Sequence, residues 1–246
     1  MAELTHVLIH GGAANARFWD RLAPHLARPV LAVDLPGRGG KPADPMRLTV
    51  EECARSVVDD VDGAGLDEVV IVAHSSGGLV VPGVVAGLGG ERVRAIVLNA
   101  ASVPPEGGCG LDCMKASHRG RTEAAIEDAR AAGRTLVTPI PERESLREAS
   151  GVRLDDEQLA FVADPSRQVA DSMNVYFQPV HWSAAAGIPK TYVVNLRDRP
   201  VPVELQREMA GRLPGRAEVV ELDAGHYAAI THPEELARIV RGAALL

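Results

Sequence analysis

A serine set among small residues, at the end of an apolar run, is the strongest chemical signal in the sequence. Ser75 follows Val72-Ala73-His74 and precedes Ser76-Gly77-Gly78. A serine on such a sharp turn from strand to helix has its hydroxyl pushed out of the sheet, and the helix N-terminus favours developing negative charge. The usual pattern is G-x-S-x-G, and this chain has Ala73 at the first small position. The segment predicts a nucleophilic serine, and a mere tight turn is the alternative.

A histidine and an aspartate later in the chain supply what a serine nucleophile needs. A free hydroxyl is weakly nucleophilic at neutral pH, so Ser75 requires a base. His226 follows the last apolar run, and we expect it to be that base. Asp198 follows the preceding apolar run, where its carboxylate would hold the imidazole in the right tautomer. Asp223 is closer to His226 in sequence, but we expect it at a strand end in a structural role.

Two glycines after the first apolar run suggest a site for negative charge. They lie in His10-Gly11-Gly12-Ala13. Glycines let the backbone turn its N–H groups toward an anion. The N–H groups of Gly12 and of Ser76, the residue after the serine, are expected to form an oxyanion hole. We expect His10 and the turn Asp34–Gly39 to be structural.

These residues must be positioned by strands and helices that alternate along the chain. The six runs rich in β-branched residues are Thr5–His10, Pro29–Asp34, Glu68–His74, Val93–Asn99, Lys190–Leu196 and Ala217–Leu222. Helical patterns cover Thr49–Asp62, Ser76–Leu88, Pro202–Arg212 and Pro233–Leu245. Nearly continuous apolar strands between helices predict an α/β fold with a doubly wound, mostly parallel six-stranded sheet. Loops after the strands then meet at one edge, which would bring Ser75, Asp198 and His226 together.

One long segment breaks this alternation. Residues 102–187 contain no convincing strand, and helical patterns occur at Thr122–Ala132, Asp155–Val162 and Ser166–Tyr176. We therefore predict a core of residues 1–101 and 188–246, with residues 102–187 inserted between strands four and five as a helical lid. A purely structural excursion is the alternative, and the charged run Glu142–Glu148 is interpreted as a solvated face.

Aromatic residues are scarce, which makes each a candidate for a specific role. The candidate substrate-binding residues are Tyr176, Phe177, His181, Trp182 and Tyr227. The first four lie near the end of the insertion, where packing in the core is an equally good explanation.

Composition excludes several other classes of function. The chain has 246 residues and a net charge of -7, so there is no basic surplus for nucleic-acid binding. Its apolar stretches are too short and broken to span a bilayer, and residues 1–4 lack the features of a signal peptide. Three cysteines suggest no disulfide framework, so we expect a cytoplasmic protein. Abundant Arg, Ala and Gly with only three Lys suggest a GC-rich, bacterial coding sequence.

No pattern predicts a metal or an organic cofactor. Cys109 and Cys113 are four residues apart, but a zinc site needs about four ligands and Cys53 is on a distant predicted helix. No dinucleotide-binding fingerprint is present. We expect a small molecule as the substrate and no cofactor.

With these motifs assembled, the chain resembles the α/β-hydrolase superfamily from Leu4 to its C-terminus. The resemblance is carried by LIHGG, DLPGRGG, AHSSGG and GH followed by HPEELA. The stretches DRPVPVELQREMA and GHYAAITHPEELA are similar to a branch of plant methylesterases, hydroxynitrile lyases and small bacterial esterases. The resemblance implies Ser75 as nucleophile, Asp198 as acid and His226 as base, with Gly12 and Ser76 as oxyanion donors.

Within that branch, one position argues against lyase chemistry. Hydroxynitrile lyases of this type have a lysine directly after the catalytic histidine, and this chain has Tyr227 there. The sequence therefore predicts a serine hydrolase of a small carboxylic ester, thioester or lactone, acting through an acyl-enzyme on Ser75. The alternatives are a triad-dependent acyl-transfer, cyclisation or elimination enzyme of secondary metabolism, and a ligand-binding protein with little turnover.

Overall fold

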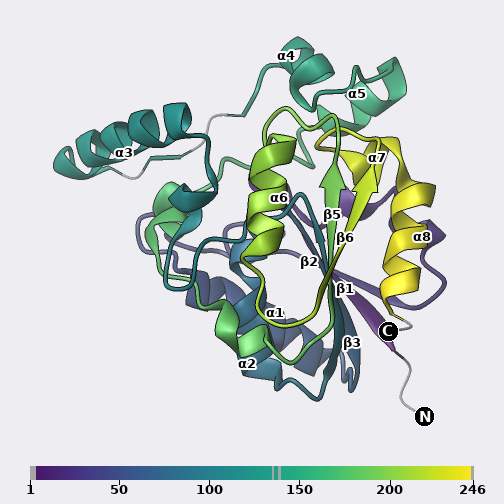
Figure 1. Ribbon diagram of the computed structural model, residues 1–246. Coiled ribbons are helices and arrows are strands. Elements are labelled where there is room, and N and C mark those ends of the chain that lie inside the picture. The colour runs from purple at the N-terminus through teal and green to yellow at the C-terminus, as the bar shows by residue number, and fades with distance from the viewer. Residues whose placement is uncertain (1–3, 135, 138–139, 245–246) are drawn as a thin grey trace.

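The computed structural model describes residues 4–134, 136–137 and 140–244. Six parallel strands form one sheet in the order β2-β1-β3-β4-β5-β6 (Figure 1). They are β1 (Thr5–Ile9), β2 (Val30–Val33), β3 (Val69–His74), β4 (Val93–Asn99), β5 (Lys190–Asn195) and β6 (Ala217–Leu222). The predicted fold class is confirmed, and each predicted strand agrees with the structure to within one residue at either end.

Helices cover both faces of the sheet because successive side chains of a buried strand point to opposite faces. In β3, Val69, Ile71 and Ala73 belong to one core cluster, while Val70 and Val72 belong to the other. The first face packs against α1 (Val50–Gly63), α2 (Val81–Leu88) and α6 (Val203–Gly211). The second packs against α7 (Ala228–Thr231), α8 (Pro233–Ala243) and the 3₁₀ segment Ala16–Trp19.

The helices of the core begin close to where the sequence predicts them. Thr49 caps α1 through a capping box, which its spacing from Glu52 in Thr49-Val50-Glu51-Glu52 indicates: Glu52 N–H donates to Thr49 Oγ1 at 3.0 Å, and Thr49 N–H donates to the Glu52 carboxylate at 2.8 Å. The helix predicted over Ser76–Leu88 is divided into a 3₁₀ turn, Ser75–Leu79, and α2. The predicted ends at Met1 and Leu245 lie outside the described residues.

The segment between β4 and β5 holds α3 (Ala116–Ala131), α4 (Arg143–Ala149) and α5 (Asp156–Val162), with short 3₁₀ turns. In Figure 1, α4 and α5 lie beyond the carboxyl ends of β5 and β6, and α3 stands to one side. The charged run Glu142–Glu148 supplies the N-cap and most of α4; Leu146 is its buried side chain. Whether this insertion acts as a lid stays a prediction.

The helix predicted over Ser166–Tyr176 is wrong. Gln168 pairs with Ala14 and Ser172 with Val137 in isolated β-bridges, and only Met173–Phe177 forms a 3₁₀ turn. Contacts with the core hold residues 168–172 extended, including a hydrogen bond of 3.1 Å from Val169 N–H to the Ala13 carbonyl. Tertiary contacts therefore override its helical pattern.

Across the described ranges, every helix is too short or too polar to cross a bilayer.

Candidate active site

The backbone at Ser75 makes the sharp turn that the motif predicts. Ser75 follows directly on β3 and has a φ of +51°, in the left-handed region that side chains rarely adopt. The next turn passes close to the loop after β1. A Cβ on Gly77 would lie 2.6 Å from the His10 carbonyl oxygen, so only glycine fits there. This turn presents Ser75 at the carboxyl edge of the sheet.

The structure brings the three predicted residues together in one hydrogen-bonded chain. His226 Nε2 lies 3.1 Å from Ser75 Oγ, and His226 Nδ1 lies 2.7 Å from Asp198 Oδ2. The Asp198 side chain is fully buried, and its other oxygen accepts the Val201 N–H at 2.7 Å. Because a carboxylate can only accept, Nδ1 carries a proton, which leaves Nε2 to accept the serine proton. Asp223 instead forms an exposed ion pair.

The backbone of His226 is held at both of its polar groups. Its N–H donates to the Ser150 carbonyl at 2.8 Å, and its carbonyl lies 2.9 Å from His74 Nε2, which must donate. Burial lowers the pKa of His74 well below its usual value, so this ring is neutral. Phe18 stacks on it with ring centroids 4.6 Å apart. The sequence patterns assigned no role to Ser150, His74 or Phe18. His74 directly precedes Ser75, and Phe18 belongs to the pair FW that follows LIHGG in the pattern shared with the superfamily, whereas Ser150 had no signal.

Gly12 and Ser76, the candidate oxyanion donors, lie next to one another. A Cβ built on Gly12 would lie 3.3 Å from Ser76 Oγ, 3.1 Å from the Tyr176 hydroxyl and 2.9 Å from Asp171 Oδ2. Any side chain at Gly12 would therefore collide with this polar cluster. Tyr176 hydrogen-bonds Ser76 there, and burial raises the pKa of Tyr176.

A buried ion pair between Arg38 and Asp171 contacts the loop that contains Gly12. Both side chains are about 5% exposed. Arg38 Nε donates to the Ala14 carbonyl at 2.8 Å, and the Asp171 carboxylate accepts the Ala13 N–H. Ala13 itself has a φ of +56°. The pair thus fixes a strained loop beside the serine. The turn containing Arg38 was expected to be structural, and no sequence pattern singles out Asp171.

His10 has the structural role that we expected. It is fully buried, and its Nε2 accepts the Leu35 N–H at 3.3 Å. Burial, with the nearby Arg38 charge, lowers its pKa to about 3, so it is neutral.

Two cavities that share no lining residue adjoin the site. One, of about 190 Å³, lies beside His226 and Gly12, and its apolar wall includes Phe18, Leu146, Phe161, Tyr227 and Ile230. The other, of about 870 Å³, is open and lies beside Ser75 and Ser76; Tyr176 and one face of α3 line it. An extended substrate could therefore place one half in each cavity.

Comparison with known proteins identifies the family. A family model described as "Alpha/beta hydrolase family" matches residues 7–239. The chain belongs to this family. The resemblance inferred from the motifs is thereby confirmed at the level of the superfamily.

Two relatives of this α/β hydrolase align over almost its whole length. Lipase LipV of Mycobacterium tuberculosis is 30% identical, over 95% of this chain and 90% of the relative. Pyrethroid hydrolase of Sphingobium wenxiniae is 27% identical, over 95% and 85%.

Solved structures show the same fold. An extracellular α/β-hydrolase from a Paenibacillus species, described as a structural and functional homologue of tobacco salicylic acid binding protein 2, has a TM-score of 0.78 at 25% identity, covering 98% of both chains. A methylesterase from Arabidopsis has a TM-score of 0.74 at 18% identity, covering 99% and 100%.

The candidate substrate-binding residues divide into two groups. Tyr176 and Tyr227 line the cavities described above. Phe177, His181 and Trp182 line neither. Arg130 lies over the Phe177 ring at 4.8 Å, and Trp182 is 1% exposed in the core beside α2.

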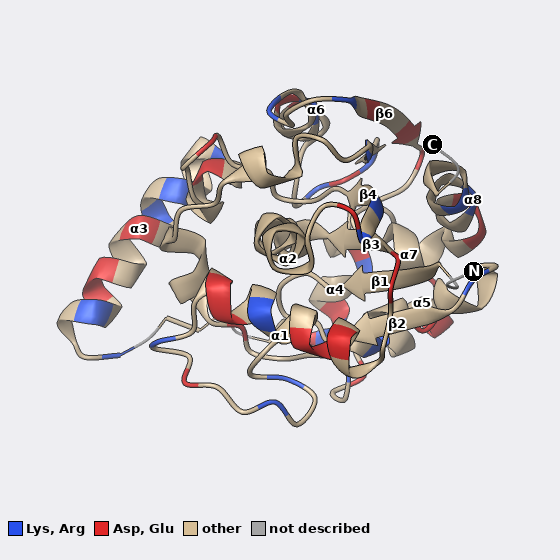
Figure 2. Ribbon diagram, turned by 90° about the horizontal axis from the view of Figure 1, so that it is seen from below, with Lys and Arg blue, Asp and Glu red and all other residues tan. Residues whose placement is uncertain are grey.

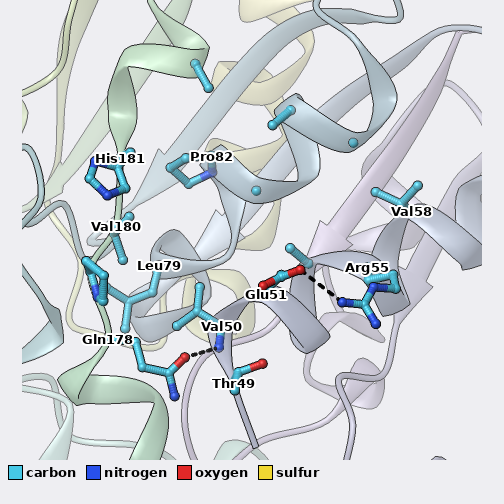
Figure 3. Close-up of a pocket in the computed structure, with 16 residues that line it drawn as sticks. Thr49, Val50, Glu51, Arg55, Val58, Leu79, Pro82, Gln178, Val180 and His181 are labelled. Carbon is cyan, nitrogen blue, oxygen red and sulfur yellow. Dashed lines mark hydrogen bonds and ion pairs between the residues drawn. The ribbon is translucent and has the colours of Figure 1, made fainter.

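His181 lies in a different groove, of about 700 Å³, formed by α1, α2 and residues 178–184 (Figure 3). Its ring is 64% exposed and lies 3.3 Å from the Glu106 carboxylate. The path of the chain explains why His181 lies in this groove and not beside Ser75. Val180 pairs with residues 107 and 108 through backbone hydrogen bonds of 3.0 and 2.8 Å, which direct the following residues back along α2. The pocket role predicted for Phe177, His181 and Trp182 thus finds no support in their positions.

Metal-ligating side chains do not gather within the described residues, where no group of three or more His, Cys, Asp or Glu could hold an ion. Cys53 and Cys113 are buried, and burial raises the pKa of each thiol to about 12, so neither is a ready thiolate ligand.

Proposed function

We propose that this α/β hydrolase is a serine hydrolase that cleaves a small carboxylic ester, thioester or lactone through an acyl-enzyme on Ser75. The observation that carries the proposal is the hydrogen-bonded chain from Ser75 through His226 to the buried Asp198. The left-handed Ser75 backbone, which aims the hydroxyl out of the sheet, supports it further. A relative over almost the whole chain is named as a lipase, a class of ester hydrolase.

The reaction would take place in two halves. Ser75 Oγ attacks the carbonyl carbon while His226 Nε2 takes its proton, and the leaving alcohol then receives that proton. In the second half His226 takes a proton from water, the hydroxide attacks the acyl-enzyme, and the acid leaves as Ser75 is reprotonated. Asp198 would stabilise the imidazolium in both halves.

The oxyanion of each tetrahedral intermediate needs preorganised donors. We assign this role to the N–H groups of Gly12 and Ser76, because the two residues adjoin one another beside Ser75. Residues 102–187 would act as a lid over this edge, with residues 1–101 and 188–246 as the catalytic core. Two residues of this lid reach the catalytic residues: Tyr176 hydrogen-bonds Ser76, and the Ser150 carbonyl accepts the His226 N–H.

The test combines turnover with direct labelling of the nucleophile. A panel of aryl esters, thioesters and lactones is assayed with wild type and Ser75→Ala, and a fluorophosphonate adduct is located by mass spectrometry. We expect hydrolysis by wild type, label on Ser75, and loss of both in the variant. Full turnover by the Ser75→Ala protein would contradict the assignment.

Product analysis separates hydrolysis from acyl transfer, cyclisation or elimination. In water enriched in ¹⁸O, hydrolysis places one solvent oxygen in the released acid, whereas the other reactions do not. A product free of ¹⁸O, formed only with intact Ser75, would favour the alternative reactions.

A further inference from the structure

One face of α3 forms a wall of the open cavity beside Ser75. His118, Arg121, Thr122 and Ala125 line it, and their spacing of i, i+3, i+4 and i+7 places them on one side of the helix. Lys115, directly before α3, lines the same cavity. The lining therefore contains two positively charged side chains, Lys115 and Arg121, and an imidazole, and none of its described side chains is acidic.

Asp112 and Glu123, the acidic residues adjacent in sequence to these lining residues, are already engaged elsewhere. Both pair with Arg119, at 2.5 and 2.8 Å. Residues of both charge signs lie along α3 (Figure 2). Lys115 donates to the Arg199 carbonyl at 2.7 Å, and Arg121 Nε donates to the Ser117 carbonyl at 3.2 Å. Because a backbone carbonyl is neutral, these hydrogen bonds do not compensate the positive charges of Lys115 and Arg121. Within the described ranges neither side chain forms an ion pair, so both retain the capacity to bind an anion.

The cavity on the other side differs in its charge. Its lining contains a single Lys or Arg, Arg167, and this guanidinium pairs with Asp20 and Asp164 at 2.8 and 2.5 Å, so no cation there is left without a carboxylate partner. His226 lines this cavity and not the one beside α3. Since His226 must hand its proton to the leaving oxygen, the alcohol belongs on the His226 side. The acyl group then extends toward α3.

We propose that the substrate is a half-ester of a dicarboxylic acid, with an apolar alcohol in the 190 Å³ cavity and a free carboxylate at Lys115, His118 and Arg121. This inference rests on the proposed function and specifies its substrate. Water would add its OH group to the acyl carbon, which completes the second carboxyl group, and its remaining hydrogen would go to the leaving alcohol. Lys115 and Arg121, with the His118 ring as a further hydrogen-bond partner, act as specificity-determining residues and take no part in the bond changes.

The experiment compares phenyl esters of one acyl length whose far end is a carboxylate, a primary amide or a trimethylammonium group. We expect kcat/KM for the carboxylate to exceed that for the amide by about tenfold at low salt, because partly exposed charges each contribute modestly. The preference should shrink in 0.5 M NaCl, where screening is strong. In the Lys115→Gln/Arg121→Gln protein the ratio should fall to about 1, and in Lys115→Glu/Arg121→Glu the ammonium ester should become preferred.

The matched control is Arg94→Gln/Arg238→Gln, which removes the same charge from exposed positions on β4 and α8. Its carboxylate preference should equal that of wild type. A mirror substrate, the hexanoate ester of 4-hydroxybenzoate, carries the anion on the alcohol and should show no preference over its amide. Hydrolysis of the amide ester without any carboxylate preference would overturn this inference alone. Absence of Ser75-dependent turnover on every ester would overturn the proposed function with it.

Discussion

Breaking the buried Arg38–Asp171 pair tests how the loop beside the serine is held. The Asp171→Asn change keeps an oxygen that can accept the Ala13 N–H but leaves the Arg38 guanidinium without its counter-charge at 5% exposure. Removing one partner of a buried pair costs about 3–5 kcal/mol. A domain has only about 5–15 kcal/mol of stability, so this is a large fraction of it.

The double variant Arg38→Met/Asp171→Asn separates the charge from the packing. Burial raises the pKa of Asp171 although the Arg38 charge acts to lower it, so desolvation opposes the attraction within the pair. Replacing both charges should therefore cost far less than the sum of the two single changes. We expect a coupling free energy of about 2–4 kcal/mol from the double-mutant cycle.

The assay is urea unfolding followed by the fluorescence of Trp19 and Trp182, both fully buried. Because the pair supports the strained Ala13 backbone beside Gly12, the Asp171→Asn protein should also lose kcat in excess of any change in KM. The reasoning would be refuted if the free energy of unfolding of the Asp171→Asn protein were within about 1 kcal/mol of wild type and the cycle showed no coupling. A buried guanidinium without a counter-charge should destabilise the fold by more than that.

Four further predictions follow from the same contacts. Asp198→Asn should lower kcat by about 10⁴-fold through the wrong imidazole tautomer, and a nearly normal rate would mean that another carboxylate orients His226. Gly77→Ala should lower the free energy of unfolding by about 1–3 kcal/mol, because its Cβ would lie 2.6 Å from the His10 carbonyl oxygen; an unchanged Tm would contradict this. Trp182→Ala should lower the free energy of unfolding by about 3–5 kcal/mol and reduce activity on all substrates alike. Loss of activity on bulky esters alone would instead indicate that Trp182 lines the substrate pocket. The folded-state pKa values of His6 and His10 are lowered to about 4 and about 3, chiefly by burial, so the unfolded chain binds more protons below pH 6.5. Stability should fall as pH falls from 6.5 toward 4, by up to about 1.4 kcal/mol per pH unit for each histidine, and urea midpoints unchanged between pH 7 and 5 would contradict this.

The sequence alone determined the sheet, its strand boundaries and the meeting of Ser75, Asp198 and His226. The reason is that these features are local or topological. Apolar runs rich in β-branched residues mark buried parallel strands, and the capping box at Thr49 marks a helix start within four residues. Once the strands are parallel, residues that follow them lie at one edge regardless of how far apart they are in the chain.

Only the tertiary structure decided how the insertion meets that edge. The stretch 166–176 has a helical pattern, but contacts with Ala13 and Arg38 hold residues 168–172 extended. Trp182 is turned into the core by the pairing of Val180. Ser150 holds the His226 N–H from 76 positions away, with no sequence signal of its own. Each of these outcomes depends on contacts between distant segments, and local periodicity contains no information about which distant group will satisfy a given N–H or charge.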